Sequence, residues 1–142
     1  MNKFFLQIKH SILTLILLML FASNSNAQDL TGSKRIPSTL FPTIKVAVDS
    51  LNSQGVGSGG VIFNIAAGYT ETISATIAVT ATGTASNQIV FRKDPLTTGA
   101  NPLITAYVGT LLSSSTLAVD GMWSFIGSDY VTIDGIDLLD PT

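Results

Sequence analysis

Apolar residues recur with a helical spacing between Pro42 and Asn52. They fall at positions i, i+3, i+4 and i+7, which places them on one face of a helix. Proline near the first helical turn fits this, since its missing N–H costs nothing there. A helix of three turns is marginal alone. We therefore expect an amphipathic helix over Pro42–Asn52 whose apolar stripe covers another part of the protein. The stripe consists of Ile44, Ala47, Val48 and Leu51.

The pattern changes after residue 53 to short apolar runs rich in β-branched residues. Gly, Pro, Asn and Ser separate these runs, which is typical of strands joined by small turns. The glycine-rich stretch GVGSGG, residues 55–60, is interpreted as a turn. The expected strands are Val61–Thr70, Thr72–Thr80, Asn87–Arg92, Pro102–Ala106, Leu117–Val119, Trp123–Ile126 and Tyr130–Leu138.

Two all-β architectures fit this order of strands. One is an antiparallel β-sandwich, and the other is a solenoid in which short strands coil and stack on the next turn. Two-residue hairpin signals are largely missing, with Asp120-Gly121 and Asp134-Gly135 as the exceptions. The pattern of residues alone leaves both architectures open.

The first 27 residues have the organisation of a secretory signal peptide. Lys3, Lys9 and His10 form a basic region, Ile12–Ala22 is apolar, and Ser25-Asn26-Ala27 is a small-residue cleavage site. The apolar run is shorter than the ~20 residues that span a bilayer. We expect an exported protein, extracellular or on the outer cell surface, with no membrane span after cleavage. Residues 28–41 are polar and are expected to form a flexible lead-in.

Removing residues 1–27 limits the available chemistry. The single histidine is lost with them, and the chain has no cysteine. Nucleophile systems that need His or Cys, and zinc sites built from these ligands, are therefore excluded from residues 28–142. The remaining segment has five basic and nine acidic residues, a formal net charge of −4. This charge does not fit a nucleic-acid-binding protein.

The stretch LNSQGVGSGGVIFNIAAGYT, residues 51–70, resembles the N-terminal cap of right-handed parallel β-helix proteins of the pectin-lyase-like class. ATGTASNQIVFRKDP, residues 81–95, is similar to the next coil of lyase-like members, with Gln88 where proline is usual. WSFIGSDYVTIDGIDL, residues 123–138, is similar to a recurring coil. The resemblance covers residues 42–139. It implies that residues 42–142 are a cap and first coils, cut short, of a surface protein of the Bacteroidota type.

Aspartates at the end of the chain are the candidate metal ligands. Asp129, Asp134 and Asp137 could supply the oxygen ligands that calcium prefers. Period-2 alternation points Val131 and Ile133 inward and Asp134 outward, and Gly135 allows a bend after which Ile136 and Leu138 return inward and Asp137 stays exposed. The competing interpretation is that these aspartates cap turns and aid solubility. No other cofactor is indicated.

Arg92 and Lys93 are candidates for a lyase base or for neutralising a uronate carboxylate, although a basic pair closing a strand also protects a sheet edge. Catalytic residues of β-helix lyases generally come from later coils. We therefore assign no catalytic residue to this chain. Two hypotheses follow: the N-terminal part of a non-catalytic, adhesin-like surface protein with a polysaccharide or surface partner, or the front of a polysaccharide lyase whose catalytic coils lie beyond Thr142.

Overall fold

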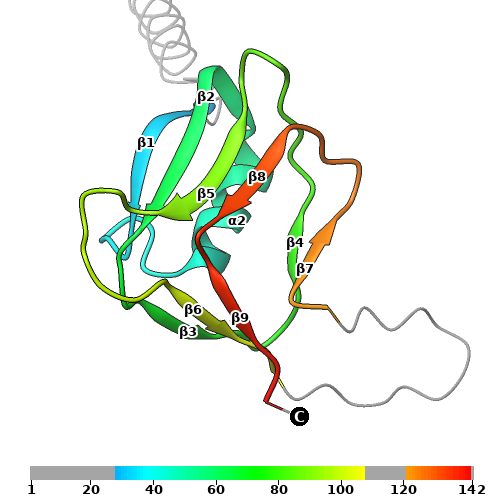
Figure 1. The fold of residues 1–142 in the computed structure, drawn as a ribbon. Helices are drawn as coiled ribbons and strands as arrows, with labels where there is room; N and C mark the ends of the chain where they lie inside the picture. The colour runs from blue at the N-terminus through cyan, green and yellow to red at the C-terminus, as the bar shows by residue number, and fades with distance from the viewer. Residues whose placement is uncertain (1–27, 108–120, 142) are drawn as a thin grey trace, which may run out of the picture.

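A computed structural model describes residues 28–107 and 121–141, and these form mostly strands with one helix (Figure 1). The elements are β1 (Leu30–Ile36), α2 (Ile44–Gln54), β2 (Val56–Ile65), β3 (Thr70–Thr72), β4 (Ile77–Val79), β5 (Ile89–Lys93), β6 (Leu103–Thr105), β7 (Trp123–Phe125), β8 (Val131–Asp134) and β9 (Asp137–Leu139).

The strands form three sheets, and from β2 onwards consecutive strands enter these sheets in turn. The sheet orders are β1-β2-β5-β8, β3-β6-β9 and β4-β7, and no sheet closes into a barrel. Each pairing between described strands is parallel. The antiparallel sandwich is therefore wrong, because it requires neighbouring strands to run in opposite directions.

Equivalent residues of successive strands lie directly opposite one another. In the largest sheet Phe63 pairs with Phe91 and Phe91 pairs with Ile133. Because side chains alternate between the two faces of a strand, such rows share one face. The inward rows form a single apolar core that also takes up the buried face of α2. The core is therefore built by stacking like positions from distant parts of the chain.

The predicted amphipathic helix is confirmed as α2. Its four stripe residues, Ile44, Ala47, Val48 and Leu51, are those that the helix buries. Thr43 caps its beginning by accepting a hydrogen bond from the Val46 N–H. Burying each larger stripe residue contributes roughly 1.5–3 kcal/mol, so most of the stability of this short helix comes from its packing.

Two sequence predictions before residue 61 are wrong. Leu30–Ile36, expected to be flexible, forms β1 and pairs in parallel with β2. GVGSGG was expected to be a turn, yet β2 begins at Val56 and runs through it. A Cβ at Gly60 would lie 2.5 Å from the Gln88 carbonyl oxygen, and the φ angle of Gly60 is +75°. Glycine there serves a close approach between strands.

Of the predictions for the rest of the chain, some are confirmed and some are wrong. Thr72–Thr80 is two strands, β3 and β4, in different sheets. The bend expected at Gly135 is confirmed by its φ of +64° between β8 and β9. The expected strand Leu117–Val119 and the signal peptide at residues 1–27 lie outside the described residues. Within the described part of the chain, no helix is long and apolar enough to cross a membrane.

Candidate functional site

Arg92 lies in a row of polar side chains on the outward face of the largest sheet. Its Nε donates a hydrogen bond to Asn64 Oδ1 at 2.9 Å, and Asn64 Nδ2 donates in turn to Ser33 Oγ. Each donor thus points back towards the strand that precedes it in the sheet. Arg92 also lies opposite Asp134 in the pairing of β5 with β8. The Arg92 guanidinium therefore holds neighbouring strands together.

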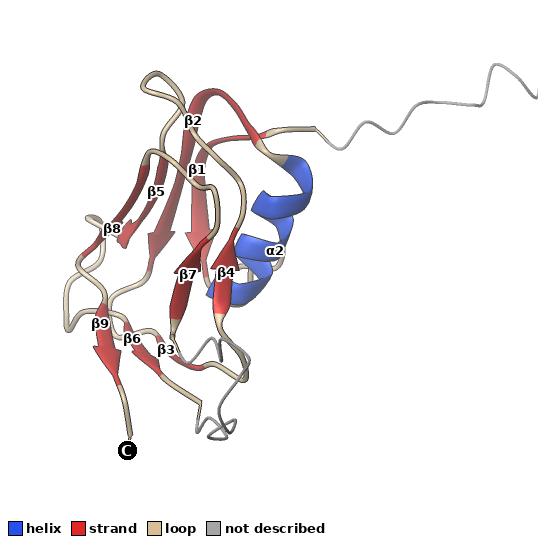
Figure 2. Cartoon of the chain, turned by 90° about the vertical axis from the view of Figure 1, so that its right-hand side faces the viewer, coloured by secondary structure: helices blue, strands red, loops and turns tan. Residues whose placement is uncertain are grey.

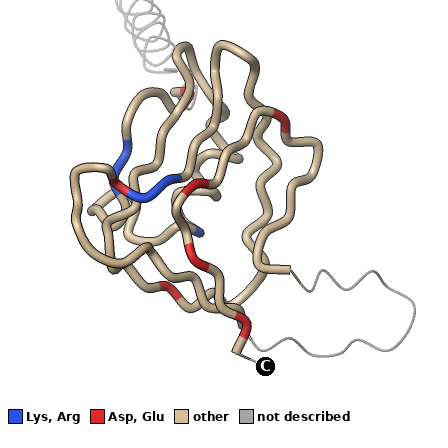
Figure 3. The backbone as a smooth tube through the Cα atoms, viewed as in Figure 1, with Lys and Arg blue, Asp and Glu red and all other residues tan. Residues whose placement is uncertain are grey.

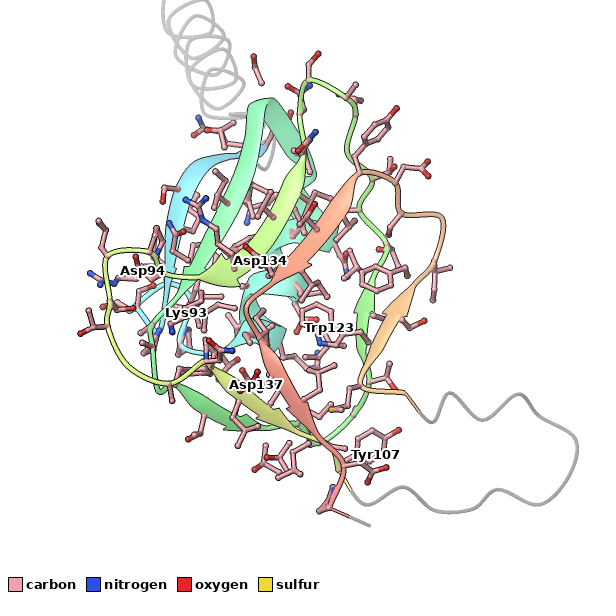
Figure 4. All side chains as sticks on the ribbon, viewed as in Figure 1. Lys93, Asp94, Tyr107, Trp123, Asp134 and Asp137 are labelled. Carbon is pink, nitrogen blue, oxygen red and sulfur yellow. The ribbon has the colours of Figure 1, made fainter. Side chains whose placement is uncertain are left out.

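Lys93 and the residue after it, Asp94, hold the turn that follows β5 (Figure 4). Lys93 Nζ donates to the Gly99 carbonyl oxygen at 2.7 Å and to Asn101 Oδ1 at 3.2 Å. Asp94 is only 4% exposed, and its Oδ2 lies 3.0 Å from Arg35 Nη2. The Lys93 amino group thus makes its contacts within the protein. These contacts favour a structural role for the basic pair Arg92-Lys93.

The three candidate calcium ligands do not form a metal site. Among residues 28–107 and 121–141 no group of three or more Asp, Glu, His or Cys side chains could hold a metal ion. Asp134 and Asp137 flank the bend between β8 and β9 (Figure 4), and Asp137 Oδ1 accepts a hydrogen bond from Asn101 Nδ2 at 3.0 Å. The Asp129 carbonyl oxygen accepts from the Gly83 N–H. The calcium hypothesis therefore has no support in this geometry.

The stack of sheets has two ends, and Figure 2 shows α2 on one side of it and β8 and β9 on the other. We call the end that contains α2, β1, β3 and β4 the closed end, and the end formed by β7, β8 and β9 the open end. β1 covers one edge of β2 at the closed end. β1 itself carries Lys34, Arg35 and a bulge between Leu30 and Gly32, which are features that protect an exposed edge from pairing.

Asn52 of α2 covers the edge of β4 at the closed end. Its Nδ2 donates to the Ala78 carbonyl oxygen at 2.7 Å, and its Oδ1 accepts from the N–H groups of Thr80 and Ala81 at 2.8 and 3.1 Å. A side-chain amide carries the same donor and acceptor as a backbone peptide. Asn52 therefore takes the place of a neighbouring strand.

Glu71 of β3 joins the second sheet to the beginning of α2. Its Oε2 accepts hydrogen bonds from the Ile44 N–H and from the Tyr69 O–H, both at 2.8 Å. A carboxylate at a helix N-terminus is stabilised by unpaired N–H groups and by the helix dipole. Burial raises the pKa of Tyr69, and the hydrogen bond to Glu71 raises it further. All three sheets are thus fastened at the closed end.

The open end exposes positions that are buried one strand earlier. Ile133 is 36% exposed although its partner Phe91 is fully buried, and Leu138 is 50% exposed although its partner Ile104 is fully buried. The prediction that these two side chains lie on the inward face is consistent with their register. They are exposed because β8 and β9 are the last described strands of their sheets, so no further described strand packs over them.

The aromatic residues likewise become more exposed towards the open end. Phe63 and Phe91 stack at 4.8 Å between ring centroids, Phe91 meets Trp123 edge to face at 5.3 Å, and Trp123 stacks on Phe125 at 6.2 Å. Phe63 is fully buried, whereas Phe125 is 48% exposed. Trp123 Nε1 is buried without a hydrogen-bond partner among the described residues. The apolar core continues to the surface at the open end.

Sequence reasoning did not identify Asn52 or Glu71 as functional residues, because the backbone groups that they bind lie 26 to 29 residues away in the chain. The open end is the candidate functional site, since it combines strands that have no neighbour on one side among the described residues with exposed apolar side chains of the inward rows. Comparison with known proteins found no match: no protein family, curated protein or solved structure matches this chain.

Proposed function

We propose that this chain is the closed first part of a right-handed parallel β-helix in an exported surface protein, and that its role is structural. In this role the closed end terminates the stack and the open end carries further coils. The order in which consecutive strands enter the three parallel sheets supports the architecture. The pattern of residues 1–27 supports export.

The contrast between the two ends is the observation that carries the proposal. A protein that works alone gains by covering its sheet edges, because open edges pair with other chains. Here β1 and Asn52 of α2 cover sheet edges at the closed end, while the open end presents Ile133 and Leu138 in register for another layer. A module that terminates a stack on one side requires this asymmetry.

A structural role is favoured over the front of a polysaccharide lyase. Arg92 and Lys93, the candidates for carbohydrate chemistry, bind Asn64, Gly99 and Asn101 within the protein. The outward face of the stack remains a surface for an extracellular polysaccharide or another surface partner, without chemistry of its own.

Hydrogen exchange on the exported chain tests the proposal. We expect slow exchange for amides of α2, β2 and β5 and fast exchange for the edge amides of β8 and β9, because open strands exchange without unfolding of the core. A chain lacking residues 2–27 serves as the control for export and should remain inside the cell. A stable monomer whose β8 and β9 amides are as protected as those of β2 would contradict the proposal.

A further inference from the structure

The open end carries charge of only one sign. The segment 121–141, which forms β7, β8 and β9, contains four aspartates and no Lys or Arg. Figure 3 shows acidic residues along β8 and β9 and basic residues at the end of β5, the neighbour of β8 in the largest sheet. The exposed core positions of this end are therefore bordered by carboxylates. The four are Asp129, Asp134, Asp137 and Asp140.

The hydrogen bonds of the outward row have a direction. Asn64 donates to Ser33 of an earlier strand, and Arg92 donates to Asn64. Asp134 follows Arg92 in register and is exposed. An ionised carboxylate only accepts hydrogen bonds, so Asp134 cannot donate as the two residues before it do. The residue placed opposite Asp134 by a further strand must therefore be a donor.

Asp137 leads to the same requirement. It begins β9 and lies opposite Leu103, and its Oδ1 already accepts from Asn101 Nδ2. A carboxylate has acceptor capacity for several donors, and charge-assisted hydrogen bonds to Lys or Arg are the stronger kind. A cation near this position is compatible with the contact from Asn101, whereas a second carboxylate is not.

We infer that the occupant of the open end is an extended segment in parallel register that places Lys or Arg opposite Asp134 and Asp137 and apolar residues opposite Ile133 and Leu138. This rests on the proposed function, and it names the chemistry of the coil that follows. A second copy of the chain docking end to end would bring four aspartates against four, so the same charges disfavour self-association. The aspartates thus determine which segment binds, and the apolar side chains supply the hydrophobic contact.

Four proteins that combine an acidic or basic host with an acidic or basic added segment test this inference. The chain is extended after Thr142 by a Gly/Ser linker of about 15 residues and a copy of its own residues 128–141, which the linker holds at about millimolar effective concentration. The copy is either native or carries Asp134→Lys and Asp137→Lys. The host is either native or carries the same two substitutions. Exchange of the edge amides of β8 and β9 measures docking, and α2 amides report that the host is folded.

The two combinations of opposite charge are expected to slow exchange of the β8 and β9 edge amides about threefold to tenfold relative to the two combinations of like charge. Raising the salt from 0.02 M to 0.5 M should reduce that difference. Equal protection in all four proteins would overturn the inference but leave the stacking proposal standing. Protection without any added segment, together with a dimer in sedimentation, would show that a second copy is the occupant and overturn it. If none of the four folded proteins showed slower exchange at the β8 and β9 edge amides, both proposals would be overturned.

Discussion

The closed and open ends are built from the same kind of short parallel strand, yet only one of them is covered. At the closed end, β1 and the amide of Asn52 cover the edges of β2 and β4, the carboxylate of Glu71 binds the first turn of α2, and Leu51 is fully buried. At the open end, Leu138 points towards the core side of its sheet and remains 50% exposed. Facing inward is therefore not the same as being buried, because burial in a stack requires a layer on both sides.

Truncating one leucine at each end gives the largest expected difference. Leu51→Ala removes a fully buried side chain and should lower the free energy of unfolding by about 2–5 kcal/mol. Leu138→Ala removes a half-exposed side chain and should cost about 1 kcal/mol or less, because the hydrophobic contribution follows the area buried. Urea unfolding of both variants measures the contrast. Equal losses would mean that the open end is covered in solution.

Asn52→Ala tests the cover over β4. The substitution leaves a carbonyl oxygen and two N–H groups of the β4 edge without their partner, and should cost about 1–3 kcal/mol of unfolding free energy. Ser53→Ala is the matched control, because the Ser53 hydroxyl is exposed and bonds within the helix to Ser50; its cost should stay below about 0.5 kcal/mol. A similar loss of unfolding free energy in the two variants would show that Asn52 does not take the place of a neighbouring strand.

The part of the fold that was predictable from sequence is the part set by local spacing. Ile44, Ala47, Val48 and Leu51 identified the buried face of α2, because a helix turns every 3.6 residues and the stripe repeats within one segment. The bend at Gly135 was predictable for a similar local reason. Outward positions such as Asp134 followed from strict alternation along one strand.

Features decided by distant pairing were not predictable. β1 reads as a polar segment, with burial only near its two ends, and it becomes a strand because it pairs with β2. The division of Thr72–Thr80 into β3 and β4 follows from their partners in two different sheets. The Asp129, Asp134 and Asp137 cluster failed as a metal site because spacing in sequence does not show whether side chains converge.

Tyr69→Phe tests the fastening of the second sheet through the pH dependence of stability. Removing the hydroxyl deletes its hydrogen bond to Glu71 and should cost about 1 kcal/mol near pH 8. Because burial raises the pKa of Tyr69 above its usual value of about 10, the neutral hydroxyl stabilises the fold below pH 10, and this contribution is lost as the pH rises further. The variant should therefore lose less stability above pH 10 than the native chain.

The control is Tyr130→Phe, which removes the hydroxyl of an exposed tyrosine at the open end. That variant keeps Tyr69 and should therefore lose stability above pH 10 as the native protein does. Unfolding in urea between pH 8 and pH 11 measures all three proteins. Parallel pH profiles for Tyr69→Phe and the native chain would show that Tyr69 does not fasten the closed end through its protonated hydroxyl.

Asp49→Asn gives the smallest expected effect. It tests whether surface charge contributes to the difference in stability between the two ends. Lys45 Nζ lies 2.7 Å from Asp49 Oδ2 on the outer face of α2, and both side chains are substantially exposed. Exposed pairs at this spacing contribute about 0.3–0.5 kcal/mol, and less in high salt. Urea unfolding at 0.05 M and 1 M salt should show a small loss that disappears. A loss as large as that of Asn52→Ala would mean that surface charge, rather than apolar burial and covered strand edges, distinguishes the closed end.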